Sequence, residues 1–168
     1  MKKKKIFYQI TLGLIYLLLI VWFSYESLKN GPESSSTSNS VGTIISEVVS
    51  TVTNKEFIVT DEIMSFIRKF IGHFSYFLIL GIVSTLFYFS FDNKKNYIIL
   101  FSINYISGFT FAFVTEFIFQ KNSMGRTPSL QDVFIDVLGF IFLSGFICQW
   151  YFFKNQCIYK NLRCLIFF

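Results

Sequence analysis

Ionisable side chains are rare within the apolar stretches of this sequence, and those present are suited to anion binding or proton transfer. Glu116 and Gln120 lie four residues apart, as do Asp132 and Asp136, so each pair shares one face of a helix. The other members of the set are basic or aromatic: Arg68, Lys69, His73, Tyr76 and Arg126. A charged group at the centre of a bilayer costs about 2.5 to 3.5 kcal/mol, so each calls for a partner or a role.

Such a set is open to three kinds of role. Arginine binds phosphate or carboxylate through paired hydrogen bonds, and His73 or Glu116 could serve as a general base. The third role is purely structural: an ion pair, for example of Glu116 with Arg126. We favour this role for each residue taken singly. For the set as a whole we favour a binding or catalytic surface. No G-x-S-x-G or H-E-x-x-H motif is present, and Cys148, Cys157 and Cys164 lack metal-ligand spacing. We therefore expect no metal and no cofactor.

The elements that position these residues follow from a strongly apolar composition. Hydrophobic residues make up 53% and aromatic residues 21% of the 168-residue chain, and the mean hydropathy is +0.54. A helix needs roughly 20 apolar residues to cross about 30 Å of hydrocarbon, and unpaired backbone groups in lipid disfavour isolated strands. We therefore predict an all-α membrane protein with four transmembrane helices, at residues 6–23, 73–91, 97–119 and 133–153.

The charges around these spans predict their orientation. Nine of the 15 Lys and Arg residues lie at one end of the spans, in segments 1–5, 92–96 and 154–168, against six at the other end. Because cytoplasmic segments are enriched in Lys and Arg, we predict that these three segments and both termini are cytoplasmic. The first span is not followed by a small-residue cleavage site, so an uncleaved anchor is favoured over a signal peptide. The net charge of +5 follows this flanking pattern and predicts no nucleic-acid partner.

On the predicted outer side, the chain has a long segment, 24–72, and a short loop, 120–132. Within the long segment, the serine-rich stretch 33–40 is predicted to be a polar linker. Two amphipathic helices, one around 41–52 and one after Asp61, are predicted to lie along the outer interface. All nine residues of the polar set fall near the outer ends of the last three spans, so we expect them to form one cluster.

The ordered polar set resembles the VanZ-like family of membrane proteins over residues 62–153. The matching pattern is Arg68-Lys69-x-x-x-His73-Phe74-x-Tyr76-Phe77-x-x-x-Gly81, then Glu116-x-x-x-Gln120, Arg126, and Asp132-x-x-x-Asp136-x-x-Gly139. The family's founding member accompanies glycopeptide-resistance genes and raises resistance to teicoplanin, which carries an acyl tail. The resemblance therefore implies a cell-envelope protein. Asp136 departs from the pattern, because it stands where we expect the family's asparagine.

Three functional hypotheses follow for a multi-pass protein in the cell membrane of a Gram-positive bacterium. The first is a non-enzymatic contribution to teicoplanin-type resistance, by binding a lipid-linked cell-wall precursor, a phospholipid or the lipoglycopeptide itself at the polar cluster. The alternative is an intramembrane hydrolase or transferase acting on a lipid or wall precursor. A small transporter is less favoured, because the polar residues are not expected to continue toward the cytoplasmic side. The lipid bilayer is the expected partner in each case.

Overall fold

The structure is a computed structural model that describes the backbone of residues 2–91 and 97–166 and the side chains of residues 3–91 and 98–153. The predicted loop 92–96 and the side chains of the predicted tail 154–168 lie outside the described residues. The elements in chain order are α1 (Lys2–Leu28), α2 (Gly31–Thr53), α3 (Asp61–Ile67), η1 (Arg68–Phe74), α4 (Ser75–Ser90), α5 (Tyr97–Val114), η2 (Thr115–Phe119), η3 (Gln120–Asn122) and α6 (Leu130–Ile166).

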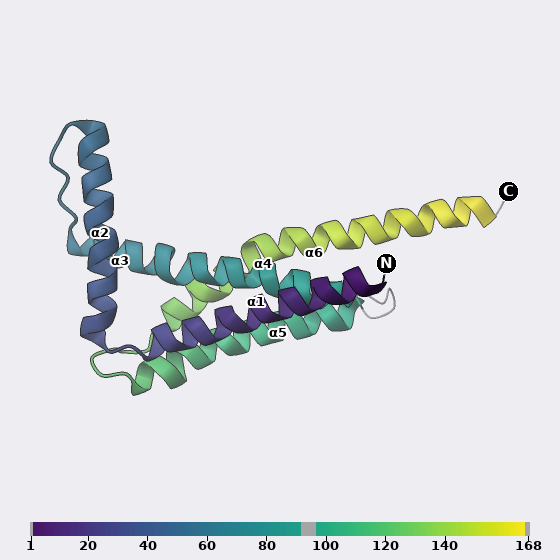
Figure 1. Cartoon of the computed structure of the whole chain (residues 1–168), viewed down its shortest axis with the longest axis horizontal. Helices are drawn as coiled ribbons and strands as arrows, with labels where there is room; N and C mark the ends of the chain where they lie inside the picture. Colours follow the sequence, from purple (N-terminus) through teal and green to yellow (C-terminus); the bar gives the residue numbers. More distant parts are fainter. Residues whose placement is uncertain (1, 92–96, 167–168) are drawn as a thin grey trace.

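The described chain is all-helical and contains four helical segments long and apolar enough to span a membrane, as predicted. They cover Lys3–Leu28, Asp61–Ser90, Ile98–Asn122 and Leu130–Phe153. Figure 1 shows α1, α4, α5 and α6 running lengthwise, with α2 crosswise at one end, which we call the α2 end. The start of α1 and the finish of α6 lie toward the other end.

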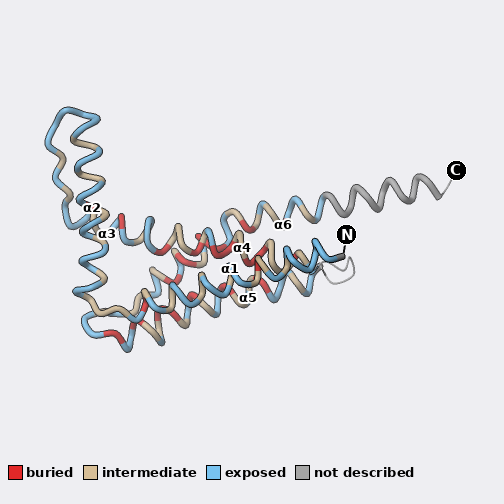
Figure 2. The backbone as a smooth tube through the Cα atoms, viewed as in Figure 1, coloured by how far each residue is buried: buried red, intermediate tan, exposed pale blue. Residues whose placement is uncertain are grey.

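The outer faces of the bundle are apolar, which fits a lipid environment. Large side chains such as Leu18, Ile106 and Phe146 are 62–66% exposed, and Figure 2 shows that buried residues gather where the lengthwise helices face one another. Soluble monomers rarely expose large contiguous apolar surfaces. Lipid acyl chains are as apolar as these side chains, so in a bilayer the side chains would be kept away from water.

The core lies where α4 packs against α6. Its buried apolar residues are Phe77, Leu80, Ala112, Val133 and Phe140. Two glycines allow the backbones to approach: a Cβ on Gly81 would meet the carbonyl oxygen of Phe140, and one on Gly139 would meet the carbonyl oxygen of Phe74. Small residues at such crossings permit the close helix packing that stabilises membrane bundles.

The serine-rich stretch 33–40 is helical, so its prediction as a linker was wrong. Asn30 caps α2 by accepting a hydrogen bond from the backbone N–H of Glu33 at 3.0 Å, and a proline follows in the first turn. Several hydroxyls then donate to the carbonyl four residues earlier, as from Ser35 to Gly31 at 2.8 Å. Serine is only mildly unfavourable in a helix, so a good cap and a Pro-initiated first turn are enough to extend the helix through this stretch.

The segment after Asp61 continues directly into the second span. Thr60 caps α3, its hydroxyl accepting from the backbone N–H of Ile63 at 3.4 Å, and α3, η1 and α4 follow one another without a break. The helix thus begins at Asp61 itself, one residue before the predicted start. The structure contains helices at both positions where interfacial helices were predicted, and their placement at a membrane surface stays a prediction.

Buried polar residues continue beyond the apolar core, contrary to the prediction used against a transporter. Asn104 donates from Nδ2 to the Thr85 hydroxyl at 2.9 Å, and both are fully buried. Ser84 and Ser144 are also fully buried. These groups are all neutral and hydrogen-bond to their neighbours, which is why sequence reasoning focused on charges overlooked them.

Candidate functional site

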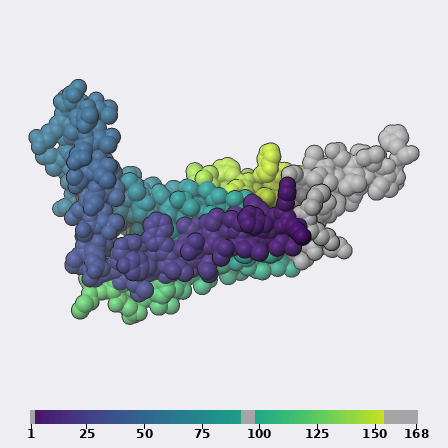
Figure 3. All heavy atoms as spheres, in the orientation of Figure 1, coloured from purple at the N-terminus to yellow at the C-terminus, as the bar shows by residue number. Residues whose placement is uncertain are grey.

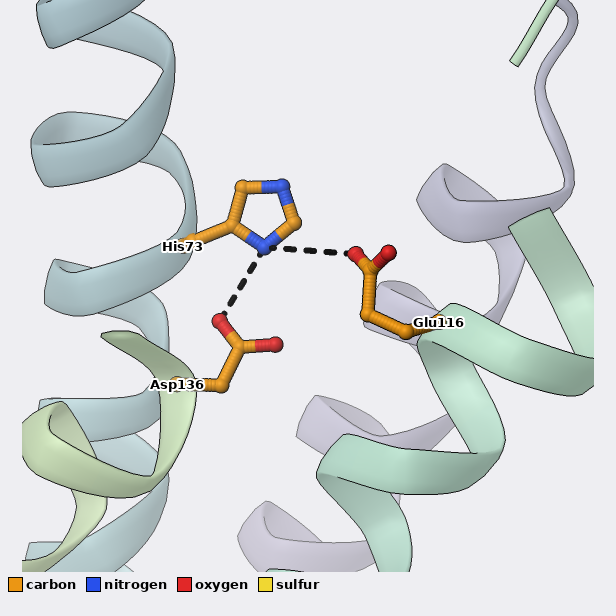
Figure 4. Close-up of side chains that lie close together, drawn as sticks. All are labelled: His73, Glu116 and Asp136. Carbon is orange, nitrogen blue, oxygen red and sulfur yellow. Dashed lines mark hydrogen bonds and ion pairs between the residues drawn. The ribbon is translucent and has the colours of Figure 1, made fainter. Parts of the chain in front are cut away.

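Three buried ionisable side chains meet between three helices, and we call them the His–Glu–Asp cluster. His73 Nδ1 lies 3.0 Å from Asp136 Oδ1 and 3.9 Å from Glu116 Oε1. His73 is 7% exposed, and Glu116 and Asp136 are fully buried. Figure 4 shows the imidazole contributed by one helix and facing carboxylates from two others. Three of the nine predicted site residues are therefore brought together, with one side-chain atom of each within 4.8 Å of the others.

Glu116 is held in place by two further donors. The side chain of Gln120 donates from Nε2 to Oε1, and the backbone N–H of Ser129 donates to Oε2 at 3.3 Å. Gln120 is itself 3% exposed. Neighbouring groups thus orient both oxygens of the carboxylate. Glu116 and Gln120, which were predicted to share one helical face, form a hydrogen bond with each other.

Unusual helix geometry aims two of the three side chains at the cluster. His73 lies in the π-helix η1, and Glu116 lies in the π-helix η2. A π-turn accommodates an extra residue and is frequent at functional sites. Opposite η1, the close approach at Gly139 lies one turn after Asp136 and brings α6 against Phe74. The cluster therefore depends on two π-helices and one glycine contact.

A more exposed ion pair lies beside the cluster. Lys69 Nζ donates to Gln131 Oε1 at 2.8 Å and lies 4.0 Å from Asp132 Oδ1. The two charged side chains are 30% and 19% exposed. Asp132 is thus paired outside the cluster, although it shares a helical face with Asp136 as predicted. Gln131 was not predicted, since a neutral residue at a helix start carries no distinct sequence signal.

A cavity of about 480 Å³ lies next to the cluster at the α2 end. Most of its wall is apolar, and the polar groups that line it include Arg68, Arg126 and His73. The remaining lining residues come from α1, α2 and the helix that starts at Asp61: Leu19, Trp22, Phe23, Glu26, Ser27, Ser34, Thr37, Ser38, Val41, Ile67, Ile71, Gly72, Ser75, Tyr76 and Ile79, together with Gln120. Figure 3 shows α2, in blue, lying across the end of α1, in purple.

The two cavity arginines have no carboxylate partner within ion-pair distance among the described residues. Arg126 is half-buried, and its Nη1 donates to the backbone oxygen of Glu26 at 3.4 Å. The predicted ion pair of Glu116 with Arg126 is therefore not formed. Burial lowers the pKa of the Arg126 guanidinium, and the neighbouring Arg68 adds to this, although the charge of Glu116 opposes it. Arginine remains cationic despite such shifts, so the cavity holds positive charge available to a ligand.

Tyr76 was predicted to belong to the polar cluster, but its side chain lies against α1. Its hydroxyl donates to the backbone oxygen of Leu19, and its ring stacks on Phe23 at a centroid distance of 3.9 Å. Phe23 also packs edge-on against His73 at 6.1 Å. Tyr76 therefore fastens α4 to α1 and forms part of the cavity wall, without contacting either carboxylate of the cluster.

The contribution of α2 and the end of α1 to the cavity was missed at the sequence level. Four residues of α2 line the cavity, yet the segment was predicted as a linker in its first half. The sequence Asn30-Gly31-Pro32 was the available signal, because asparagine at the N-cap followed by proline in the first turn marks a helix start.

Comparison of the chain with protein families, with curated proteins and with solved structures found no match.

Proposed function

We propose that this chain is a VanZ-like cell-envelope protein that binds an anionic amphiphile in the cavity at the α2 end and thereby contributes to teicoplanin-type glycopeptide resistance. The amphiphile is a lipid-linked wall precursor, a phospholipid or the acylated glycopeptide. The protein would lie in the cell membrane of a Gram-positive bacterium with both termini cytoplasmic and the α2 end outside. The observation that carries the proposal is a mostly apolar cavity with two arginines that have no carboxylate partner within ion-pair distance in the described part of the chain.

The cavity has the size and chemistry that such a ligand requires. Ligand pockets commonly measure about 300 to 1,000 Å³ and combine apolar walls with a few polar groups, and this cavity of about 480 Å³ falls in that range. Trp22 and Ile79 supply apolar surface for an acyl chain or prenyl chain, while Arg68 and Arg126 supply hydrogen bonds for a phosphate or carboxylate. An anionic head group would also offset the burial of Arg126.

A hydrolase or transferase is the second candidate, favoured by the position of His73. Its Nδ1 faces Asp136 at 3.0 Å, and Figure 4 shows the second ring nitrogen turned away from both carboxylates. His73 also lines the cavity. A histidine oriented by a carboxylate through one nitrogen can take a proton through the other, so a water beside a bound ester could be activated here.

Ligand binding tests the first candidate directly. The full chain in nanodiscs is titrated with a fluorescent phospholipid carrying an anionic head group and with its zwitterionic counterpart of equal acyl length. Hydrogen bonds to charged groups contribute about 1.5 to 3 kcal/mol, so Arg126→Gln or Arg68→Gln should weaken anionic binding by about 10- to 100-fold. Lys121→Gln is the matched control, since Lys121 is exposed and outside the cavity lining.

Equal binding of both lipids, or equal losses in the control and the arginine variants, would refute an anion-binding cavity. In a Gram-positive host, expression should raise resistance to an acylated glycopeptide more than to one without an acyl tail. The second candidate predicts product release from a phospholipid or lipid-linked precursor that His73→Gln abolishes. Binding without any product would leave the first candidate as the function.

A further inference from the structure

The His–Glu–Asp cluster has the composition of a metal site. His73, Glu116 and Asp136 each offer one ligand atom, and these atoms lie within 4.8 Å of one another. A cation about 2.0 to 2.2 Å from each ligand requires ligand atoms roughly 3 to 4 Å apart. The separations of 3.0 Å from His73 Nδ1 to Asp136 Oδ1 and 3.9 Å to Glu116 Oε1 fall in that range, and the ligand atoms of the two carboxylates lie within 4.8 Å of each other.

A second feature of the cluster points to a bound cation. Asp136 is fully buried, yet its Oδ2 has no hydrogen-bond partner among the described residues. Figure 4 shows this oxygen on the side of the cluster that faces Glu116. A buried carboxylate oxygen without a donor costs about 1 to 3 kcal/mol or more. A cation bound by both oxygens of Asp136 would satisfy it.

Charge balance leads to the same conclusion. The carboxylates of Glu116 and Asp136 together carry two negative charges when ionised, and they are fully buried. A divalent cation bound with a neutral imidazole would cancel both charges, which makes the burial of the set far less costly. The mixture of one nitrogen and two oxygen ligands is suited to zinc and neighbouring transition metals, whereas Mg²⁺ and Ca²⁺ favour oxygen alone.

Outer-shell hydrogen bonds are also in place. Gln120 and the backbone of Ser129 orient the two oxygens of Glu116, and such partners commonly fix metal-ligating side chains. His73 lines the cavity, which gives a cation a path to the cluster. Three protein ligands leave one coordination position for water or substrate, which is the pattern of catalytic zinc sites.

We propose that His73, Glu116 and Asp136 bind one divalent transition-metal cation, with Zn²⁺ as the best match. The proposal departs from the sequence-based expectation of no metal. It goes beyond amphiphile binding, because the cation needs neither arginine of the cavity.

The test uses Zn²⁺ alone, without lipid ligand, on the purified full chain in detergent. Wild-type protein should retain one zinc after dialysis, measured by mass spectrometry of the metal. His73→Ala or Asp136→Asn should weaken binding by more than about 100-fold, and Gln120→Ala by about 10- to 100-fold, as for an outer-shell residue. Glu62→Gln is the control, since Glu62 is an exposed carboxylate on α3, and Arg126→Gln should also retain zinc.

A measurement on the wild type covers the case in which variants fail to fold. Co²⁺ bound at one nitrogen and two oxygens should give visible absorption that an equimolar amount of Zn²⁺ removes. No retained zinc and no cobalt absorption would overturn the proposal, as would His73→Ala binding zinc as tightly as wild type. Preference for Mg²⁺ over Zn²⁺ would also overturn it. Loss of lipid binding in the arginine variants with zinc retained would separate the two proposals.

Discussion

Replacing Gly139 by alanine should separate α6 from η1 and open the His–Glu–Asp cluster. The added Cβ would meet the carbonyl oxygen of Phe74 and lie 3.2 Å from its carbonyl carbon and Cα. Carbon atoms pack best about 3.5 to 4.0 Å apart, so restoring the carbon contacts alone would take a shift of about 0.3 to 0.8 Å, and relieving the closer contact with the oxygen puts the separation at the upper end of that range. No side-chain rotation can relieve this contact, because the atoms opposite belong to the main chain.

The cost of this change should lie at the upper end of the overpacking range. Inserted methyl groups in well-packed interiors cost about 1 to 3 kcal/mol, and about 3 kcal/mol corresponds to a roughly 100-fold change in the unfolding equilibrium constant. A shift of this size would also stretch the 3.0 Å contact of His73 with Asp136 toward the limit of a hydrogen bond. Equilibrium unfolding in mixed SDS micelles, followed by circular dichroism, measures the free energy.

Gly72→Ala is the matched control, because a Cβ at Gly72 would have no atom within 4 Å. Alanine there should leave the free energy of unfolding unchanged or raise it by about 0.5 to 1 kcal/mol through helix propensity. The double variant Gly81→Ala with Gly139→Ala should cost less than the sum of the two, since both act on the contact of α6 with the helix from α3 to α4. A fully stable Gly139→Ala variant, or equal damage from Gly72→Ala, would refute the role assigned to this contact.

Three further predictions concern hydrogen bonds. In metal-free protein, Asp136→Asn should keep the fold and lower the free energy of unfolding by about 1 kcal/mol, because a charged acceptor is replaced by a neutral one. His73→Ala should lower it by about 3 to 5 kcal/mol, because buried carboxylates lose their partner. Unfolding in SDS compares the two variants. Asn30→Ala should cost about 1 kcal/mol and speed hydrogen exchange at the first amides of α2, while exchange in α4 stays unchanged. Asn104→Ala should lower the free energy of unfolding by about 1 to 3 kcal/mol by leaving the buried Thr85 hydroxyl without its donor, and an unaltered unfolding midpoint would contradict this.

The number and positions of the long helices could be predicted because a bilayer favours one kind of spanning structure. Apolar runs of about 20 residues become helices in a bilayer, and the four predicted spans correspond to the helical segments that are long and apolar enough to cross it. The meeting of His73, Glu116 and Asp136 could also be anticipated, since alternating spans place their polar ends in one layer. Orientation relative to the cytoplasm depends on the membrane, so it stays a prediction.

The pairing within the polar set could not be read from residue types. Spacing along a helix does not give the rotation of that helix against its neighbours, and here the rotation is set by η1, η2 and the contact at Gly139. As a result, Asp132 faces Lys69 outside the cluster, and Tyr76 is bound to α1. The first half of helix α2 was overlooked because its serine-rich composition was given more weight than the N-cap residue that precedes it.

The two π-helices make the chain length around the cluster as significant as its chemistry. A π-turn takes up one more residue than an α-turn in nearly the same rotation. Deleting one residue from 68–72 would therefore let the segment close as an α-helix with His73 near its present direction, whereas an α-helix that kept all seven residues of η1 would turn His73 away from the cluster. Related chains that lack the extra residue would then still bring the three ionisable residues together.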